Sequence, residues 1–201
     1  MKKLLIIAMA LLSLNFANAQ TAEELKAERQ QIKAELTNKK NIKKAKKIEK
    51  KVEQIVPLVG SSRLVSKPNE TGINSVDGLT NTVSSLLAVS VSSSDLLSNY
   101  KQEICDNGDG DIEITKYKAK AQDYLALIPI LAQASLDVAQ AAQQLKSVKD
   151  DLKSLSPAQA ASATKVVNWN IDAIDITQAK LNETTKLVTN LVNTLKATKN
   201  L

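Results

Sequence analysis

The chain has 201 residues, with 27 lysines and arginines, 21 aspartates and glutamates, one cysteine and no histidine. Without histidine there is no Ser-His or Cys-His nucleophile pair, no imidazole zinc site and no general base with a pKa near neutrality. A single cysteine excludes an internal disulfide and a C-x-x-C redox pair, and no glycine-rich phosphate-binding loop is present. Carboxylates such as Asp172, Asp175 and Glu183 are expected on the outer faces of their helix. We therefore expect no enzyme, no catalytic residues and no cofactor beyond weakly bound calcium.

The first nineteen residues have the three parts of a secretory signal peptide. A charged start is followed by an apolar run over residues 4–14 and then by Ala17-Asn18-Ala19, an A-x-A cleavage site. This pattern, in a chain of bacterial type, predicts a periplasmic or secreted protein cleaved near Ala19. The alternative is an uncleaved anchor. A helix needs about 20 apolar residues to span a bilayer, and this apolar run is shorter.

Residues 20–56 are expected to form a basic amphipathic arm. Thr21 and Glu24 have the spacing of a capping box, so a helix should begin directly after the cleavage site. Up to Leu36 the apolar residues share one face, whereas from Ala45 onwards they lie on roughly the opposite face. Either the first half projects from the rest of the protein, or the helix breaks near residues 38–41. We favour a projecting, partly frayed arm.

The positive charge of the chain is concentrated in this arm. Residues 22–53 hold 11 basic and 6 acidic residues, a net charge of +5, and eight lysines lie opposite the apolar stripe. Such a basic amphipathic helix suits an anionic surface or polymer, and the alternative is a solvated outer face. Lysine without arginine or aromatic residues gives little selectivity, so no nucleic-acid partner is expected. The candidate binding residues are Lys39, Lys40, Lys43, Lys44, Lys46, Lys47, Lys50 and Lys51.

An irregular connection over residues 57–75 leads into a helix predicted over residues 76–104. The connection contains two glycines and a proline after Pro57, which ends the preceding helix. The middle of the helix's apolar seam is serine, which predicts a locally hydrogen-bonded polar layer. The seam consists of Val76, Leu79, Val83, Leu86, Ser90, Ser93, Leu97, Tyr100 and Ile104.

Residues 105–116 resemble part of an EF-hand calcium loop. Counted from Cys105 as position one, Asn107 and Asp109 fall at positions three and five. Cys105 and Lys116 replace the two strongest carboxylate ligands, so the resemblance implies at most weak calcium binding. The alternative is an acidic turn that ends one helix and starts the next. The candidate metal ligands are Asn107, Asp109 and Asp111.

Cys105 is also a lone thiol in a protein expected to enter an oxidising compartment. An intermolecular disulfide, in a homo-oligomer or with another protein, is one interpretation. A half-buried, inert cysteine is the commoner situation.

Residues 112–155 and 157–200 are predicted to form a long helical hairpin. Ser156 to Gln159 resemble a capping box with Pro157 at the first helical position, and so short a connection makes the helices antiparallel. Trp169 and Ile176 lie off the main seam and indicate a further neighbouring helix. The rows of the first helix are Leu127, Ala134, Ala141, Val148 and Leu155, and Leu131, Val138, Leu145 and Leu152.

These patterns predict an all-α fold, an elongated antiparallel bundle of about four helices with the hairpin as its core. Residues 76–201 would form the bundle, in a single domain with the arm. The expected function is that of an exported, non-enzymatic interaction protein whose partner is an unknown protein or an anionic envelope surface. The alternative is a membrane-active, pore-forming-like protein, for which residues 83–97 are the only inserting segment we expect, although their serines argue against insertion.

Overall fold

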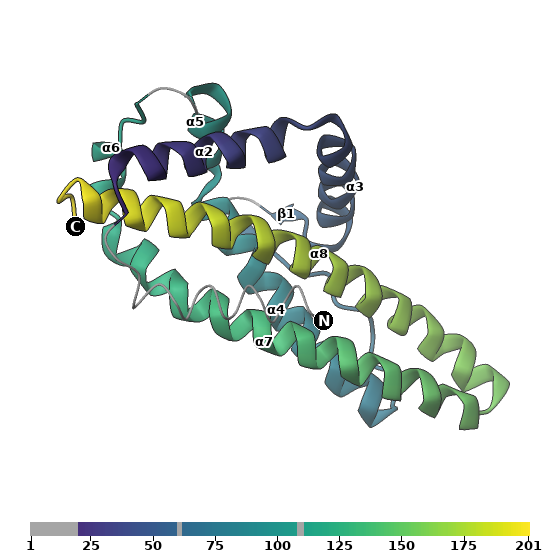
Figure 1. Cartoon of the computed structure of the whole chain (residues 1–201). Helices are drawn as coiled ribbons and strands as arrows, with labels where there is room; N and C mark the ends of the chain where they lie inside the picture. The colour runs from purple at the N-terminus through teal and green to yellow at the C-terminus, as the bar shows by residue number, and fades with distance from the viewer. Residues whose placement is uncertain (1–19, 60–61, 108–110) are drawn as a thin grey trace.

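The computed structural model describes residues 20–59, 62–107 and 111–201. The predicted signal peptide, with its cleavage site near Ala19, lies outside these residues. Within them almost every element is an α-helix, and the molecule is elongated (Figure 1). The predicted all-α bundle is confirmed.

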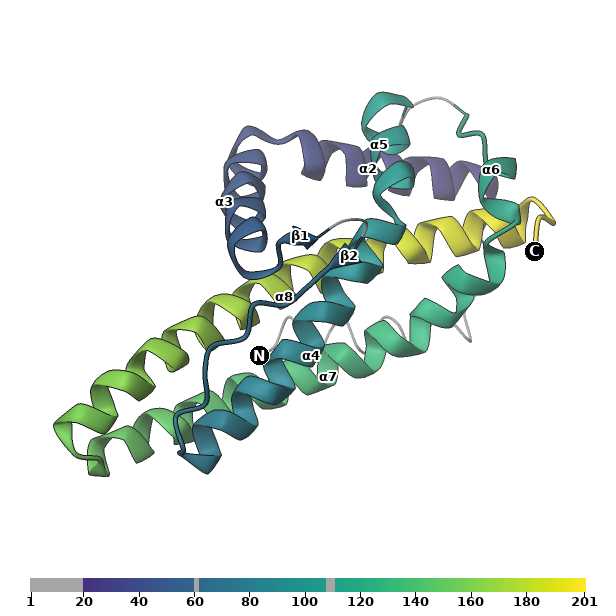
Figure 2. The same cartoon turned by 180° about the vertical axis from the view of Figure 1, so that it is seen from behind.

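The bundle is built on three long helices: α4 (Asn74–Leu96), α7 (Ala121–Asp151) and α8 (Pro157–Ala197). Helices α7 and α8 form the predicted antiparallel hairpin, and α4 lies along both of them (Figures 1 and 2). Leu131 and Val138 of α7 are fully buried, as the heptad rows predict, and Leu181 and Val188 of α8 are fully buried as well. Burial decreases towards the turn between the helices, where Leu155 is only half-buried.

Helix α8 is the centre of the molecule. Over residues 173–195 its side chains are buried on most sides, because further helices pack on the side away from the hairpin seam. Ala173 and Ile176 are fully buried there, which confirms the further neighbour predicted from the off-seam positions. Polar groups also cross this interface: the Asn170 amide donates to the Thr80 hydroxyl of α4 over 2.8 Å.

The N-terminal arm consists of two helices, α2 (Ala22–Thr37) and α3 (Lys39–Ile55). Thr21 and Glu24 form the predicted capping box. The chain turns at Asn38, whose side-chain oxygen accepts from the backbone N–H of Lys40 at 2.9 Å and begins α3. The projecting, frayed arm is therefore wrong, because α2 packs on α5 and α8 and buries Leu25. The predicted alternative, a break near residues 38–41, is confirmed, since two opposite apolar faces need two differently directed helices.

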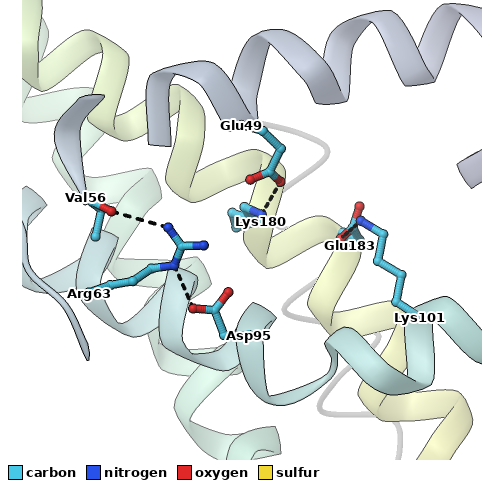
Figure 3. Close-up of polar contacts among 7 residues, drawn as sticks. All are labelled: Glu49, Val56, Arg63, Asp95, Lys101, Lys180 and Glu183. Carbon is cyan, nitrogen blue, oxygen red and sulfur yellow. Dashed lines mark hydrogen bonds and ion pairs between the residues drawn. The ribbon is translucent and has the colours of Figure 1, made fainter. Parts of the chain in front are cut away.

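The connection over residues 57–75 contains a short antiparallel ladder that was not predicted. Strands β1 (Leu58–Val59) and β2 (Ser62–Arg63) pair Leu58 with Arg63. The Arg63 guanidinium holds this ladder to the bundle, donating to the Asp95 carboxylate over 2.9 Å and to the Val56 carbonyl over 3.4 Å (Figure 3).

The helix predicted over residues 76–104 is divided at Leu97 into α4 and α5 (Ser98–Asn107). Its predicted seam is nevertheless buried from Val76 to Ile104, across the break. The Ser90 hydroxyl donates to the Leu87 carbonyl over 2.9 Å, which is the local hydrogen bonding expected of the serine layer.

The hairpin begins later than predicted. Residues 111–114 are not helical, α6 (Thr115–Lys118) is a single turn, and α7 starts at Ala121 instead of residue 112. Tyr117 fixes α6. Its ring packs edge-on against the ring of Tyr100, with 5.2 Å between the ring centroids, and its hydroxyl donates to the Glu103 carboxylate over 2.5 Å. After α7, the turn η1 (Leu152–Ser154) leads to Pro157 at the first turn of α8, as predicted.

At the start of α8 the capping differs from the prediction. The Ser156 hydroxyl donates to the Gln159 side chain over 2.8 Å and makes no hydrogen bond to the helix backbone. Proline at the first turn already removes one of the amide donors that a cap would satisfy. Helix α8 therefore begins with Pro157 in its first turn and without the predicted capping box.

Candidate functional site

Helix α3 is attached to the bundle by only half of its length. Its apolar stripe runs along one face, and at the C-terminal end Val52 and Ile55 are buried. Further towards the N-terminus Ile48 is half-buried, Ile42 is 37% exposed, and Ala45 is exposed. The first two turns of α3 therefore stand away from α8 with their apolar face uncovered.

The eight predicted binding lysines all lie on α3 and do not behave alike. Lys51 is half-buried and pairs with Asp172 of α8 at 2.5 Å, so it is part of the attachment. The other seven are exposed and make no ion pair with any residue that the structure describes. Three of these seven line a groove beside α3: Lys44, Lys46 and Lys50. The remaining four, which we call the outer lysines, are Lys39, Lys40, Lys43 and Lys47.

The groove lies between α2, α3, α5 and α8 and has a volume of about 960 Å³. Figures 1 and 2 show the frame: α2 and α3 form a corner above α8, and α5 closes the side opposite α3. The apolar part of its wall comes from α2, α3 and α8. It consists of Ile32, Leu36, Ile42, Ala45, Ile48 and Ala179.

Three ion pairs tie the walls of the groove together. Lys180 of α8 pairs with Glu49 of α3 at 2.5 Å, and Lys101 of α5 pairs with Glu183 of α8 at 2.7 Å (Figure 3). The third pair joins Lys186 of α8 to Glu35 of α2. The expectation that Glu183 lies on an outer face is wrong, because α5 packs over it and leaves only 22% of its side chain exposed.

Cys105 of α5 lies in the wall of this groove. It is half-buried, and burial raises the pKa of its thiol, against the smaller opposing effect of the nearby Lys101 charge. The thiol also lines a smaller adjoining cavity of about 270 Å³, together with Glu49, Lys101 and Lys180. The position of Cys105 fits the half-buried interpretation, and the intermolecular disulfide stays a prediction.

The acidic turn is only partly described. Asn107 and Asp111 are exposed, and Asp109 lies outside the described residues. The Asp106 carboxylate accepts two hydrogen bonds from the Gln102 amide. Among the residues that the structure describes, no group of three or more acidic or cysteine side chains gathers as metal ligands would. Weak calcium binding stays a prediction.

A buried polar cluster joins α2, α5 and α8, and the sequence patterns did not indicate it. The Asn190 amide is fully buried and donates to the Leu25 carbonyl and to Glu28, while it accepts from the Tyr100 hydroxyl over 2.7 Å. Burial of Tyr100 raises the pKa of its phenol. Arg29 is also buried and donates to a threonine hydroxyl of α8 at 3.2 Å. This cluster fixes the position of α2, and with it one wall of the groove.

The helix that could insert into a membrane is not the segment expected from the sequence. Among the described residues, the segment Ala121–Ser154 is long and apolar enough to cross a membrane, judged by length and composition alone. Only 28% of its most apolar window is buried, and Ile130 and Leu136 are exposed. Residues 83–97 do not meet this test.

Comparison of the chain with models of known protein families, with characterised proteins and with solved structures gives no match.

Proposed function

We propose that the protein is an exported, non-enzymatic interaction protein that binds an anionic envelope surface through helix α3. The observation that carries this proposal is the contrast between two sets of lysines. Lys51, Lys101, Lys180 and Lys186 each pair with a carboxylate of another helix. Seven lysines of α3 have no such counter-charge among the described residues, although acidic side chains occur throughout the bundle.

Unpaired lysines at this density favour attraction over mere solubility. Each lysine near an anionic membrane contributes about 1 kcal/mol of binding free energy, so several together give useful affinity. The attraction is screened over about 8 Å at physiological ionic strength, so binding should weaken steeply as salt is added. Lysine lacks the planar fork of arginine, so the interaction recognises charge and not a particular headgroup.

The outer lysines allow this proposal to be tested without disturbing the groove. A variant with Lys39, Lys40, Lys43 and Lys47 replaced by Gln removes four charges from exposed positions of α3. A matched control replaces four exposed lysines of α7 and α8 by Gln: Lys146, Lys149, Lys165 and Lys196. Both variants have the same net charge, so only the location of the change differs.

The measurement is co-sedimentation with vesicles that contain phosphatidylglycerol, at low and high salt. We expect the wild type and the control to pellet at low salt and the α3 variant to remain in solution. Equal pelleting of the two variants, or no pelleting of the wild type, contradicts the proposal. Binding to an anionic polysaccharide without binding to vesicles would identify a polymer as the partner.

Helix α7 supports a second candidate, a membrane-active protein. Its length, its apolar composition and its low burial are the features of a helix that could leave the bundle for lipid. Release of a dye trapped in the same vesicles distinguishes the two candidates, because surface binding leaves the vesicles intact. Leakage that is lost when Ile130 and Leu136 are both replaced by Asn would favour the second candidate.

A further inference from the structure

We propose that the groove between α2, α3, α5 and α8 binds a single-chain carboxylate amphiphile of the fatty acid class. This ligand and this site go beyond the proposed surface binding. The groove uses the inner side of α3, whereas the outer lysines do not line it.

The first support is an apolar stripe that is covered along only half of its length. Ile48, Val52 and Ile55 continue the line of Ile42 and Ala45 at helical spacing, and they pack into the core. Ile42, Ala45 and Ile48 also line the groove, and of these Ile42 and Ala45 are exposed in it. A ligand that covers Ile42 and Ala45 would remove their apolar surface from water. An acyl chain can do this because it brings no polar group that would need a hydrogen-bond partner.

The second support is the charge of the groove. Six lysines and four glutamates line it, and three of the glutamates are already neutralised by the ion pairs that join its walls. Lys46 and Lys50 lie one helical turn apart on the same wall and make no ion pair with described residues. They provide two adjacent positive charges for one carboxylate at the end of an apolar chain.

The third support is the kind of side chain in the wall. No arginine and no aromatic residue is among the described residues that line the groove. Protein partners are usually held by such residues, and nucleobases need aromatic faces on which to stack. Aliphatic side chains with lysines at the rim match an aliphatic chain with one acidic end. The volume of about 960 Å³ also lies at the upper end of the range of small-molecule sites.

Cys105 provides a direct measure of occupancy, because it lies in the groove wall and is the only cysteine of the chain. The rate at which N-ethylmaleimide labels it at constant pH is measured by mass spectrometry, with and without laurate below its micellar concentration. A saturating ligand that fills the groove should slow labelling roughly tenfold, in proportion to the unoccupied fraction. Titration calorimetry with laurate measures the same binding independently.

Two matched pairs of variants define the site. Ala45→Trp places a large ring in the groove and should weaken laurate binding at least roughly tenfold, whereas Gln54→Trp, on an exposed part of α3 outside the groove, should not. Replacing Lys46 and Lys50 by Gln should weaken laurate binding roughly tenfold and leave binding of uncharged dodecanol unchanged. Each variant is compared with itself with and without ligand, so a change in the intrinsic reactivity of Cys105 cancels.

The outcomes separate this proposal from the surface-binding one. The outer-lysine variant should still bind laurate but should no longer pellet with vesicles. Ala45→Trp should still pellet with vesicles but should bind laurate weakly. No protection of Cys105 and no heat with wild-type protein would overturn the groove proposal. Equal affinity for laurate and dodecyltrimethylammonium, or unchanged binding in Ala45→Trp, would overturn it as well.

Discussion

Helices α2 and α3 are consecutive, are both rich in charge and are separated only by Asn38, yet they are held in opposite ways. Helix α2 has few apolar residues, but it buries Leu25 and Ile32 and even Arg29. Helix α3 has the clearer apolar stripe, but only Val52 and Ile55 at its end are buried. The comparison shows that a strong amphipathic pattern does not determine how much of a helix is covered. Helix α2 makes buried polar contacts with α8 through Arg29 and Leu25, whereas the ion pairs between α3 and α8 are partly exposed.

The largest expected effect is a contrast between two apolar truncations in the arm. Leu25 is 1% exposed, so Leu25→Ala should lower the free energy of unfolding by about 2–5 kcal/mol, because it leaves a cavity under α2. Ile42→Ala, in the uncovered part of α3, should change it by less than about 0.5 kcal/mol. Urea unfolding followed by circular dichroism measures both, and equal losses would remove the distinction between the helices.

The next effect concerns the polar contacts that hold α2. Asn190→Ala should cost about 1–3 kcal/mol, because it leaves the buried Tyr100 hydroxyl without its Asn190 acceptor and removes the bond to the Leu25 carbonyl. Asn193→Ala is the matched control, since Asn193 is only half-buried and donates to Gln20 near the end of the described chain. The same unfolding experiment should show a smaller loss for the control. Similar values for both variants would mean that the cluster does not fix α2.

Alkaline pH should act on Tyr100 of this cluster and on the two tyrosines stacked beside it. Burial raises the pKa of Tyr100, Tyr117 and Tyr124, and for Tyr117 the hydrogen bond to Glu103 adds to the effect. Because a tyrosine of the unfolded chain has a pKa of about 10, the stabilisation is fully present below that pH and is lost as the pH rises above it. For Tyr100 alone the loss is at most about 1.4 kcal/mol for each further pH unit. Absorbance of tyrosinate should therefore rise together with the loss of helix, and tyrosinate formed in a fully helical protein would contradict this.

The smallest expected effect is at the corner between the two helices. Asn38→Ala removes the cap of α3 and should cost about 1 kcal/mol, while Asn38→Asp should restore the stability because its carboxylate accepts the same backbone N–H groups. The change in melting temperature measures both. The Asn41 side chain also donates to the Glu35 carbonyl across the corner at 2.8 Å, so the loss should stay small. A large loss in Asn38→Ala would mean that the corner, and not the buried cluster, holds the arm.

Repetition in the sequence made the bundle predictable. Rows of apolar residues seven positions apart specify a helix face without reference to any other part of the chain. The burial of Leu131, Val138, Leu181 and Val188, and of the seam that passes through Leu97, follows from such rows. The division of that seam into α4 and α5 could not be predicted in this way, because the buried face continues through the break.

The site depends on contacts that no local pattern contains. Arg29 lies between Leu25 and Ile32 on the face of α2 that is buried. A charged residue at this position breaks the row of apolar residues, so the sequence did not show that this face is buried. Glu49 and Lys180 are 131 positions apart, and their pairing follows only from the direction in which α3 leaves the corner. The exposure of seven of the eight lysines agrees with the amphipathic pattern. The pattern does not show that Lys46 and Lys50 line the groove and the outer lysines do not, because the groove is formed by several helices.

The three ion pairs across the groove give its shape a dependence on the surrounding electrolyte. They join α8 to three different helices, so weakening them loosens every wall at once, while Val52 and Ile55 still hold the end of α3 by apolar contact. Partly exposed pairs weaken as ions accumulate around them, but apolar contacts do not. Added salt should therefore loosen the walls of the groove, while the apolar attachment of α3 at Val52 and Ile55 persists.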